Sequence, residues 1–265
     1  MSHHNNINNF FGGVKEVDLG QLTYYFPLDA ANYVGSNRHD DTVGGTKVTI
    51  FYGSNTPGVF APYEANRARL WYRTDSPSYG RMDNTDFRLG DGTTDFSHSA
   101  FVAVSPDNIG PQPLFLFDKR FNGLNGGTTE REFSFFIEAN GTFQIKFFDK
   151  TDNSKAILAI SSVATALVNG EEAVIGWSYD EPTKDLRVFK NGVDVTETQT
   201  TDAEYVCMAG ATGTLYRTYW HRTGGGTRYS YNGKMQDVGF AIGSVWGGGE
   251  MLSLYQKILN DEMPR

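Results

Sequence analysis

The stretch AVIGWSYDEPTKDLRVFKNGVDV, residues 173–195, decides the fold class of this chain. Its first eight residues place large apolar side chains at every second position, which is the period of a β-strand. A Pro-containing turn over residues 180–184 follows, and the alternation then resumes in LRVF. Asn191-Gly192 accepts the positive φ of a tight hairpin turn. The stretch therefore predicts a strand, a turn, a second strand and a second turn.

A second segment, REFSFFIEANGTFQIKFFD at residues 131–149, predicts another hairpin. Asn140-Gly141 supplies its turn. Large apolar residues occupy alternate positions on both sides of this turn, so they share one face of the paired strands. They are Phe133, Phe135, Ile137, Phe143, Ile145 and Phe147. We expect this face to lie in the core of a sheet.

Composition agrees with an all-β chain. The 265 residues include 30 glycines, 19 phenylalanines and 14 tyrosines, which fits many short strands joined by turns. All-β sandwiches of roughly 200 to 250 residues commonly form one domain, so one large domain is favoured over two small ones. Residues 156–168 have the composition of a helix, but their small and β-branched residues are equally compatible with a strand followed by a loop.

At the stretch 173–195 the chain resembles the laminin G-like, concanavalin A-type jelly-roll family. LRVFKNGV at residues 186–193 is similar to a strand and turn typical of that family. Other segments follow in the family's order: LTYYFPLD at 22–29, HDDTVGG at 39–45, RARLWY at 67–72, FRLGDGTTDFSHSAFVAV at 87–104 and NGKMQDVGFAIGSVWGGGEMLSLY at 232–255. The last segment resembles the closing strand and a short helical turn.

The resemblance implies an all-β, two-sheet antiparallel jelly-roll sandwich over residues 20–265. Residues 1–19 are polar and glycine-containing, so we expect them to form an extended N-terminal attachment arm. The chain departs from the family pattern at two positions. Gln236 stands where an acidic residue is common, and Trp246 with three glycines replaces a polar loop.

Several function classes are disfavoured by the sequence. A net charge of −8 and a pI near 5.1 oppose binding to nucleic acid. The glycine clusters are expected to be turns without a following helix, so they do not predict a phosphate-binding loop. No apolar run has the length of a membrane span, and residues 1–13 lack the basic and apolar regions of a signal peptide. Cys207 is expected to be a small buried apolar residue.

Catalysis is not predicted. Glycosidases on this scaffold carry acidic residues at alternating positions of one strand, and no such E-x-D-x-E run occurs. Glu130 and Glu132 alternate beside Arg131, where we expect a solvated strand end. The five histidines lack metal-ligand spacing, and no serine lies in a G-x-S-x-G elbow. The sequence therefore predicts a protein that is not an enzyme.

Calcium is the cofactor that the resemblance brings forward, although no cofactor is predicted outright. Domains of this family often place two aspartates, corresponding to Asp29 and Asp237, near each other at the ends of the opening and closing strands. Hard cations prefer several such oxygen ligands. A solvated or hydrogen-bonded aspartate at a strand end is the favoured interpretation.

Four residues are candidates for contact with a glycan or with another subunit: Trp220, His221, Arg222 and Trp246. Both tryptophans lie in turn-like surroundings, where an exposed aromatic ring beside polar groups could stack on a sugar. The favoured alternative is that the tryptophans pack under their own loops or into a subunit interface.

Laminin G-like domains work mostly outside cells, whereas this chain shows no export signal. A phage structural protein, made in the host cytoplasm and released by lysis, reconciles the two. We therefore predict a non-enzymatic virion surface protein, decorating the phage head in multiple copies or as a homo-oligomer. Phe10 and Phe11 would anchor the arm on other virion proteins such as the major capsid protein. The alternative function is a carbohydrate-binding adhesin or a tail-fibre-type receptor-binding module for host surface glycans.

Overall fold

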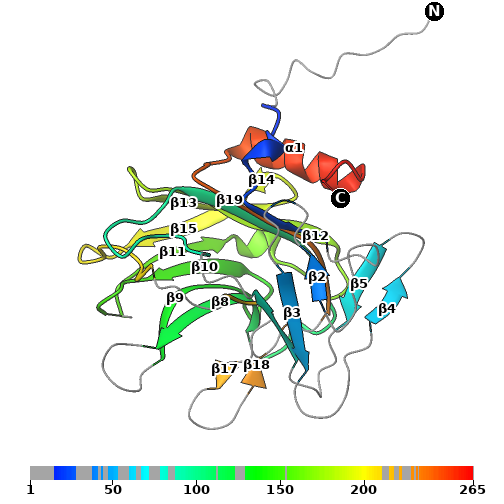
Figure 1. Cartoon of the computed structure of the whole chain (residues 1–265), viewed down its shortest axis with the longest axis horizontal. Helices are drawn as coiled ribbons and strands as arrows, with labels where there is room; N and C mark the ends of the chain where they lie inside the picture. The colour runs from blue at the N-terminus through cyan, green and yellow to red at the C-terminus, as the bar shows by residue number, and fades with distance from the viewer. Residues whose placement is uncertain are drawn as a thin grey trace, which may run out of the picture.

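The described part of the chain folds into a β-sandwich of two antiparallel sheets, with one α-helix outside it (Figure 1). This computed structural model describes residues 15–27, 38–40, 43, 47–52, 60–63, 67–71, 78–82, 87–111, 113–122, 129–152, 154–210, 215–217, 221–222, 228–229, 231 and 233–264. The predicted sandwich is confirmed. The predicted arm residues 1–14 lie outside the described residues.

The first sheet has eight strands. The long strands at its centre are formed by the apolar segments described above. Its order is β14 (Val193–Asp194), β13 (Asp185–Lys190), β12 (Ala173–Asp180), β7 (His98–Pro106), β19 (Gly233–Ile242), β5 (Arg67–Trp71) and β4 (Phe60–Tyr63), with β1 (Tyr24–Phe26) also paired to β19. The opening strand β1 thus pairs with the closing strand β19.

The second sheet has nine strands. Its order is β15 (Thr196–Thr201), β11 (Ala156–Ser161), β10 (Phe143–Phe148), β9 (Thr129–Ile137), β8 (Leu114–Asn122), β16 (Leu215–Arg217), β6 (Ser78–Met82), β3 (Lys47–Tyr52) and β2 (Arg38–Asp40). A separate two-stranded ribbon pairs β17 (His221–Arg222) with β18 (Arg228–Tyr229).

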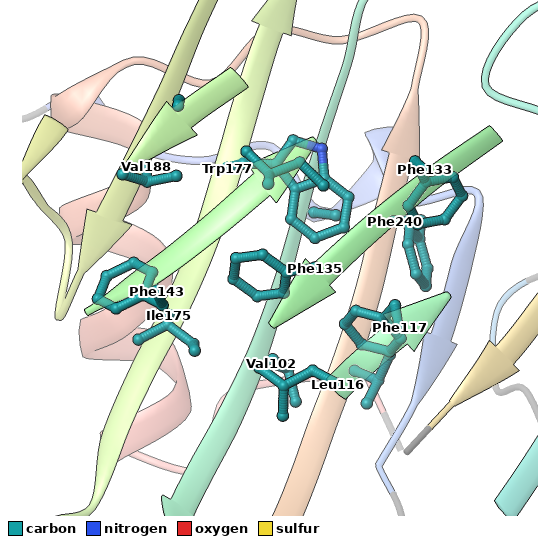
Figure 2. Packing of buried hydrophobic residues seen from close by; sticks show 14 of the residues in the cluster. Val102, Leu116, Phe117, Phe133, Phe135, Phe143, Ile175, Trp177, Val188 and Phe240 are labelled. Carbon is teal, nitrogen blue, oxygen red and sulfur yellow. The ribbon is translucent and has the colours of Figure 1, made fainter. Parts of the chain in front are cut away.

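The core lies between the facing sides of the two sheets. Trp177 from β12 lies at its centre, and its ring centroid is 4.9 Å from that of Phe135 on β9 and 6.1 Å from that of Phe240 on β19. Figure 2 shows Phe135, from the nine-stranded sheet, beside Trp177, from the eight-stranded sheet. Ile145 on β10 is paired with Phe135. All six alternating apolar residues of the 131–149 hairpin are fully buried, so its predicted register is confirmed.

The predicted turns also form. Asn191 and Gly192 both have positive φ, of 52° and 81°, and they join β13 to β14. In the other hairpin Gly141 has a φ of 83°, and a Cβ there would lie 2.1 Å from the carbonyl oxygen of Leu167. Both glycines are thus required by conformation. Residues 156–168 form strand β11 and a 3-10 turn, η3 (Val163–Thr165), rather than an α-helix.

A twelve-residue helix, α1 (Gly248–Leu259), follows the closing strand. The expectation that the glycine clusters precede no helix is wrong at residues 247–249, because Gly247 is the N-cap of α1. Apolar residues make a second cluster where the helix packs on the outer face of the eight-stranded sheet. Its members include Phe101, Val174, Phe189, Trp246, Met251, Leu254 and Ile258. Figure 1 shows α1 on the side of β12, β13 and β19 and away from β8 to β11.

The first described residues of the chain, from Lys15 onward, pack against this helix. Lys15 lies 2.7 Å from Glu250 in an ion pair, and the backbone N–H of Val17 donates to the hydroxyl of Ser253 at 3.2 Å. Val17 is buried in the cluster around α1. Residues 15–19 were assigned from sequence to the arm. A short 3-10 turn, η2 (Leu19–Gln21), begins at the last of them. The packed part of the described chain therefore starts at Lys15.

Candidate functional site

The two outer faces of the sandwich differ. The helix α1 and the chain segment around Val17 pack on the outer face of the eight-stranded sheet. The outer face of the nine-stranded sheet, which we call the open face, lies on the other side of the molecule (Figure 1). Side chains on this face come from the alternate positions of the strands whose other residues fill the core. The position of the open face is therefore set by the strands whose other side chains form the core.

One row of side chains crosses the open face near the loop end of the β9–β10 hairpin. The strand registers place Phe136 beside Gln144, Gln144 beside Ile160 and Ile160 beside Thr198. Phe115 on β8 is paired with Phe136, and their rings stack with centroids 4.9 Å apart and planes inclined by 28°. This row runs from aromatic residues through an amide to a hydroxyl.

A second, more polar row lies beside the first. Ser134 is paired with Asp118 on one side and with Lys146 on the other, and Lys146 is followed by Leu158 and Thr200. The hydroxyl of Ser134 donates to the carboxylate of Asp118 at 2.6 Å. Both of these side chains are buried. Counted from Asp118, Lys146 is the first side chain of this row that is half-buried rather than buried.

The open face becomes more accessible from β8 toward β15. Phe115 is only 6% exposed, whereas Phe136, Lys146, Leu158 and Ile160 are half-buried and Thr198 and Thr200 are exposed. The accessible part thus combines one aromatic ring, two aliphatic side chains, an ammonium group and two hydroxyls. This part of the open face is therefore amphipathic.

Hydrogen bonds fix the polar groups at its border. The side-chain N–H of Gln144 donates to the carboxylate of Glu138. Partial burial is the main cause that raises the pKa of Glu138. The ammonium of Lys146 lies 5.0 Å from the ring centroid of Phe148, within the range of a cation–π contact. These groups are therefore held in place before any ligand arrives.

Trp246 does not form an exposed aromatic platform. It is 1% exposed, its indole N–H donates to the side chain of Gln21 at 2.9 Å, and its ring centroid lies 6.2 Å from that of Phe101. Its backbone N–H donates to Ser99 at 2.8 Å. The indole packs under its own loop, which is the alternative that the sequence analysis favoured, and its faces are not available to a sugar.

The other three candidates are the consecutive residues Trp220, His221 and Arg222. His221 and Arg222 form β17, paired with Tyr229 and Arg228 of β18. Figure 1 shows this ribbon on the opposite side of the molecule from α1. Trp220 lies outside the described residues, so its predicted role stays a prediction.

Asp237 occupies a bulge of β19, with a φ of 51°. It is 2% exposed, and its two oxygens accept from the hydroxyl of Tyr25 at 2.6 Å and from the amide of Gln236 at 2.8 Å. This is the hydrogen-bonded state favoured from sequence. Asp29 lies outside the described residues, so the calcium pair stays a prediction. Among the residues that the structure describes, no group of three or more His, Cys, Asp or Glu could hold a metal ion.

The expectation that Glu132 lies at a solvated strand end is wrong. It is 2% exposed and forms an ion pair of 2.6 Å with Lys119, which is fully buried. Lys119 is paired with Phe133 and the next residue, Arg120, with Arg131, so Glu132 is an extra residue in β9. This β-bulge breaks the alternation on which the sequence interpretation rested.

Buried polar groups also tie the loop after β15 to the sandwich. Asp95 accepts hydrogen bonds from the hydroxyl of Tyr205 at 2.7 Å, from that of Tyr179 at 3.2 Å and from the backbone of Met208 at 2.7 Å. Burial raises the pKa of Asp95 despite these donors. Cys207 in the same loop is fully buried, as predicted, and burial raises the pKa of its thiol.

The residues of the open face were not among the candidates predicted from the sequence. The alternation of the 131–149 hairpin identified only the core positions. The intervening positions carry a signal of their own, because Phe136 and Phe148 are aromatic where a fully solvated face would be polar. Their partner residues on β8, β11 and β15 could not be identified without the strand order.

Known structures share this fold at very low sequence identity. No protein-family model matches the chain, and no curated protein sequence matches it. Domain 4 of the arabinanase AbnA from Geobacillus stearothermophilus, solved in complex with arabinotriose, is 13% identical, with a TM-score of 0.52 over 89% of this chain and 98% of that domain. The binding domain of botulinum neurotoxin serotype C1 is 10% identical, with a TM-score of 0.60 over 91% of this chain and 53% of that one.

The sialidase of Trypanosoma rangeli, solved in complex with sialic acid, gives a TM-score of 0.57 at 8% identity over 89% of this chain. The chain spans about a third of the length of that sialidase, with 32% covered. These likenesses establish the class of protein as a β-sandwich of jelly-roll type. No helix in the described part of the chain has the length and apolar character needed to cross a membrane.

Proposed function

We propose that this protein is a carbohydrate-binding β-sandwich module that holds its ligand on the open face of the nine-stranded sheet. The observation that carries the proposal is the accessible group of Phe136, Lys146, Leu158, Thr198 and Thr200 on rigid neighbouring strands. Sugars present hydroxyls at their edges and C–H groups on their ring faces. A surface with hydrogen-bonding groups beside apolar side chains satisfies both.

The similar structures support the proposal through their own ligands. The arabinanase domain, of which 98% is matched, was solved with arabinotriose, an oligosaccharide. The fold alone does not carry the ligand to this chain, because one fold serves many functions. The residues of the open face therefore carry the proposal, and the comparison suggests sugar oligomers as the first ligands to test.

We propose binding without catalysis. The carboxylates of the described open face are each held by a neighbour, Asp118 by the hydroxyl of Ser134 and Glu138 by the amide of Gln144. Asp118 is also fully buried. A glycosidase needs two carboxyl groups that flank a substrate bond, one of them a proton donor. This arrangement favours a structural role for both groups.

A panel of plant and bacterial polysaccharides, including arabinan, tests the proposal. Binding is measured by affinity electrophoresis and calorimetry, and hydrolysis by release of reducing ends. We expect saturable binding without turnover, weakened about tenfold or more by Lys146→Ala because at least one charge-assisted hydrogen bond is lost. Arg187→Ala is the matched control, since Arg187 is exposed on β13 of the other sheet. Binding that Lys146→Ala and Phe136→Ala leave unchanged would remove the open face as the site.

The predicted placement of this module on a phage head stays a prediction. Its proposed partner, the major capsid protein, would be contacted by Phe10 and Phe11, which lie outside the described residues. In that setting many copies would present the open face together, and avidity would strengthen weak sugar binding. The adhesin alternative uses the same face as a receptor-binding module.

A further inference from the structure

A crevice lies on the side of the sandwich opposite the open face, where the last turns of α1 leave part of the eight-stranded sheet uncovered. The cavity volume of this crevice is about 70 Å³. That volume is well below the roughly 300 to 1,000 Å³ of drug-sized sites, so only a small ligand fits. Its floor is formed by the outward residues of the central strands, and α1 forms one wall. The residues that the argument uses are Ser105, Gln236, Val174, Tyr255, Ile258 and Leu259.

Two polar groups on the floor lack a partner. Ser105 is 2% exposed and Gln236 is 8% exposed, and neither the hydroxyl of Ser105 nor the side-chain oxygen of Gln236 has a hydrogen-bond partner within the described part of the protein. The amide nitrogen of Gln236 donates to Asp237 at 2.8 Å, which fixes the orientation of the amide and leaves its oxygen as an acceptor. An unsatisfied buried polar group is costly, so a ligand that bonds to these two atoms would remove that cost.

The spacing of these groups limits the occupant. Ser105 is paired with Lys234, so Gln236 is its diagonal neighbour on the adjacent strand, with Cα atoms roughly 7 to 8 Å apart. A ligand that satisfies both groups therefore carries polar atoms at two separate positions. The hydroxyl of Ser105 can donate or accept, and the oxygen of Gln236 requires a donor. Two hydroxyls on different carbons of one ring meet these requirements.

The wall opposite the polar floor is apolar. Ile258 is buried and Tyr255 half-buried in α1, while Leu259 at the mouth is 55% exposed. Val174 closes the floor beside them. A flat ring with an apolar face and hydroxyls at its edge matches this division into a polar floor and an apolar wall.

We propose that the crevice between α1 and the strands β7, β12 and β19 is a second sugar subsite that takes a single pyranose. The hydroxyl of Ser105 and the side-chain oxygen of Gln236 bind two of its hydroxyl groups, and α1 covers its C–H face. The inference rests on the carbohydrate chemistry proposed for the open face and adds a separate site. A chain with both sites could hold a branched or long glycan at opposite sides of the sandwich.

Nuclear magnetic resonance of the full ¹⁵N-labelled chain tests this site with D-glucose, D-galactose, D-mannose and N-acetyl-D-glucosamine as probes. We expect at least one sugar to shift the resonances of Ser105, Gln236 and Ile258 saturably. Ser105→Ala should weaken that binding about tenfold, the equivalent of one hydrogen bond. The substitution removes an unpartnered hydroxyl, so the thermal midpoint should stay unchanged or rise. Leu259→Trp should block the mouth, and Ser244→Ala is the matched control outside the crevice.

The outcomes separate this inference from the proposed function. Shifts confined to Phe136, Lys146 and their neighbours would overturn the crevice site and leave the open face standing. An affinity that neither Ser105→Ala nor Leu259→Trp changes would also overturn it. Absence of sugar binding at both places, together with failure of the polysaccharide panel, would overturn both proposals.

Discussion

The histidine in the core gives a measurable dependence of stability on pH. His98 is fully buried at the start of β7, among the rings of Phe147, Trp177 and Tyr179, with centroids 5.4, 6.2 and 5.6 Å away. Its Nδ1 lies 2.6 Å from the carbonyl oxygen of Phe96, so Nδ1 carries the proton of the neutral ring. Burial lowers the pKa of His98 from 6.5 to about 4. The folded protein therefore keeps this ring neutral where an unfolded chain protonates it.

The sign and size of the effect follow from proton linkage. Above pH 6.5 the ring is neutral in both states and contributes no pH dependence. As the pH falls from 6.5 toward 4, His98 binds a proton in the unfolded state but not in the folded state. The free energy of unfolding therefore decreases. The shift corresponds to about 3 kcal/mol in full and about 2 kcal/mol between pH 7 and pH 5.

The variant His98→Phe keeps an aromatic ring at this position and removes the titration. Urea unfolding of both proteins at pH 7, 6 and 5 gives their free energies of unfolding. We expect the variant to be less stable at pH 7, because the carbonyl of Phe96 loses its donor, and the gap to narrow by about 2 kcal/mol at pH 5. All other titrating groups are common to both proteins and cancel in this comparison. An equal slope with pH in the two proteins would refute the buried neutral state.

Three further predictions concern stability and assembly. Phe135→Ala should lower the free energy of unfolding by about 3 to 5 kcal/mol, measured by urea denaturation, because the ring is fully buried; an unchanged midpoint would contradict the core assignment. Glu132→Gln should cost about 3 to 5 kcal/mol by leaving the Lys119 charge buried without its partner, and adding Lys119→Met should recover much of that loss; a double variant as unstable as the single one would contradict this. Deletion of residues 1–14 should leave the thermal transition intact, since the packing on α1 begins at Lys15, and should abolish co-sedimentation with phage particles that lack the protein; retained co-sedimentation would end the anchor hypothesis.

The regular part of the fold could be predicted from the sequence because its signals are local. Alternating Phe133, Phe135 and Ile137 specify a face, and Asn191-Gly192 specifies a turn. A two-residue period and a preference for positive φ both act within a few residues. They identify strands and hairpins, but not which distant strands become neighbours.

The site depends on the contacts that local patterns do not contain. The open face exists because β10 lies between β9 and β11, and because β11 pairs with β15 far along the chain. Glu132 was expected at the surface, but a one-residue bulge turns it inward. Trp246 was a candidate platform, but α1 and Phe101 enclose it. In each case tertiary packing overrides the local preference.

The position of α1 makes two opposite ends of the molecule different. Lys15 and Glu16 are ion-paired to Glu250 and Lys257, so the described start of the chain and its last helix share one pole. The open face looks away from that pole (Figure 1). A tether at either end would therefore point this face outward from whatever carries the domain. The same geometry recommends the C-terminus as the handle for immobilisation, because a sensor surface attached there leaves the opposite face free for ligand.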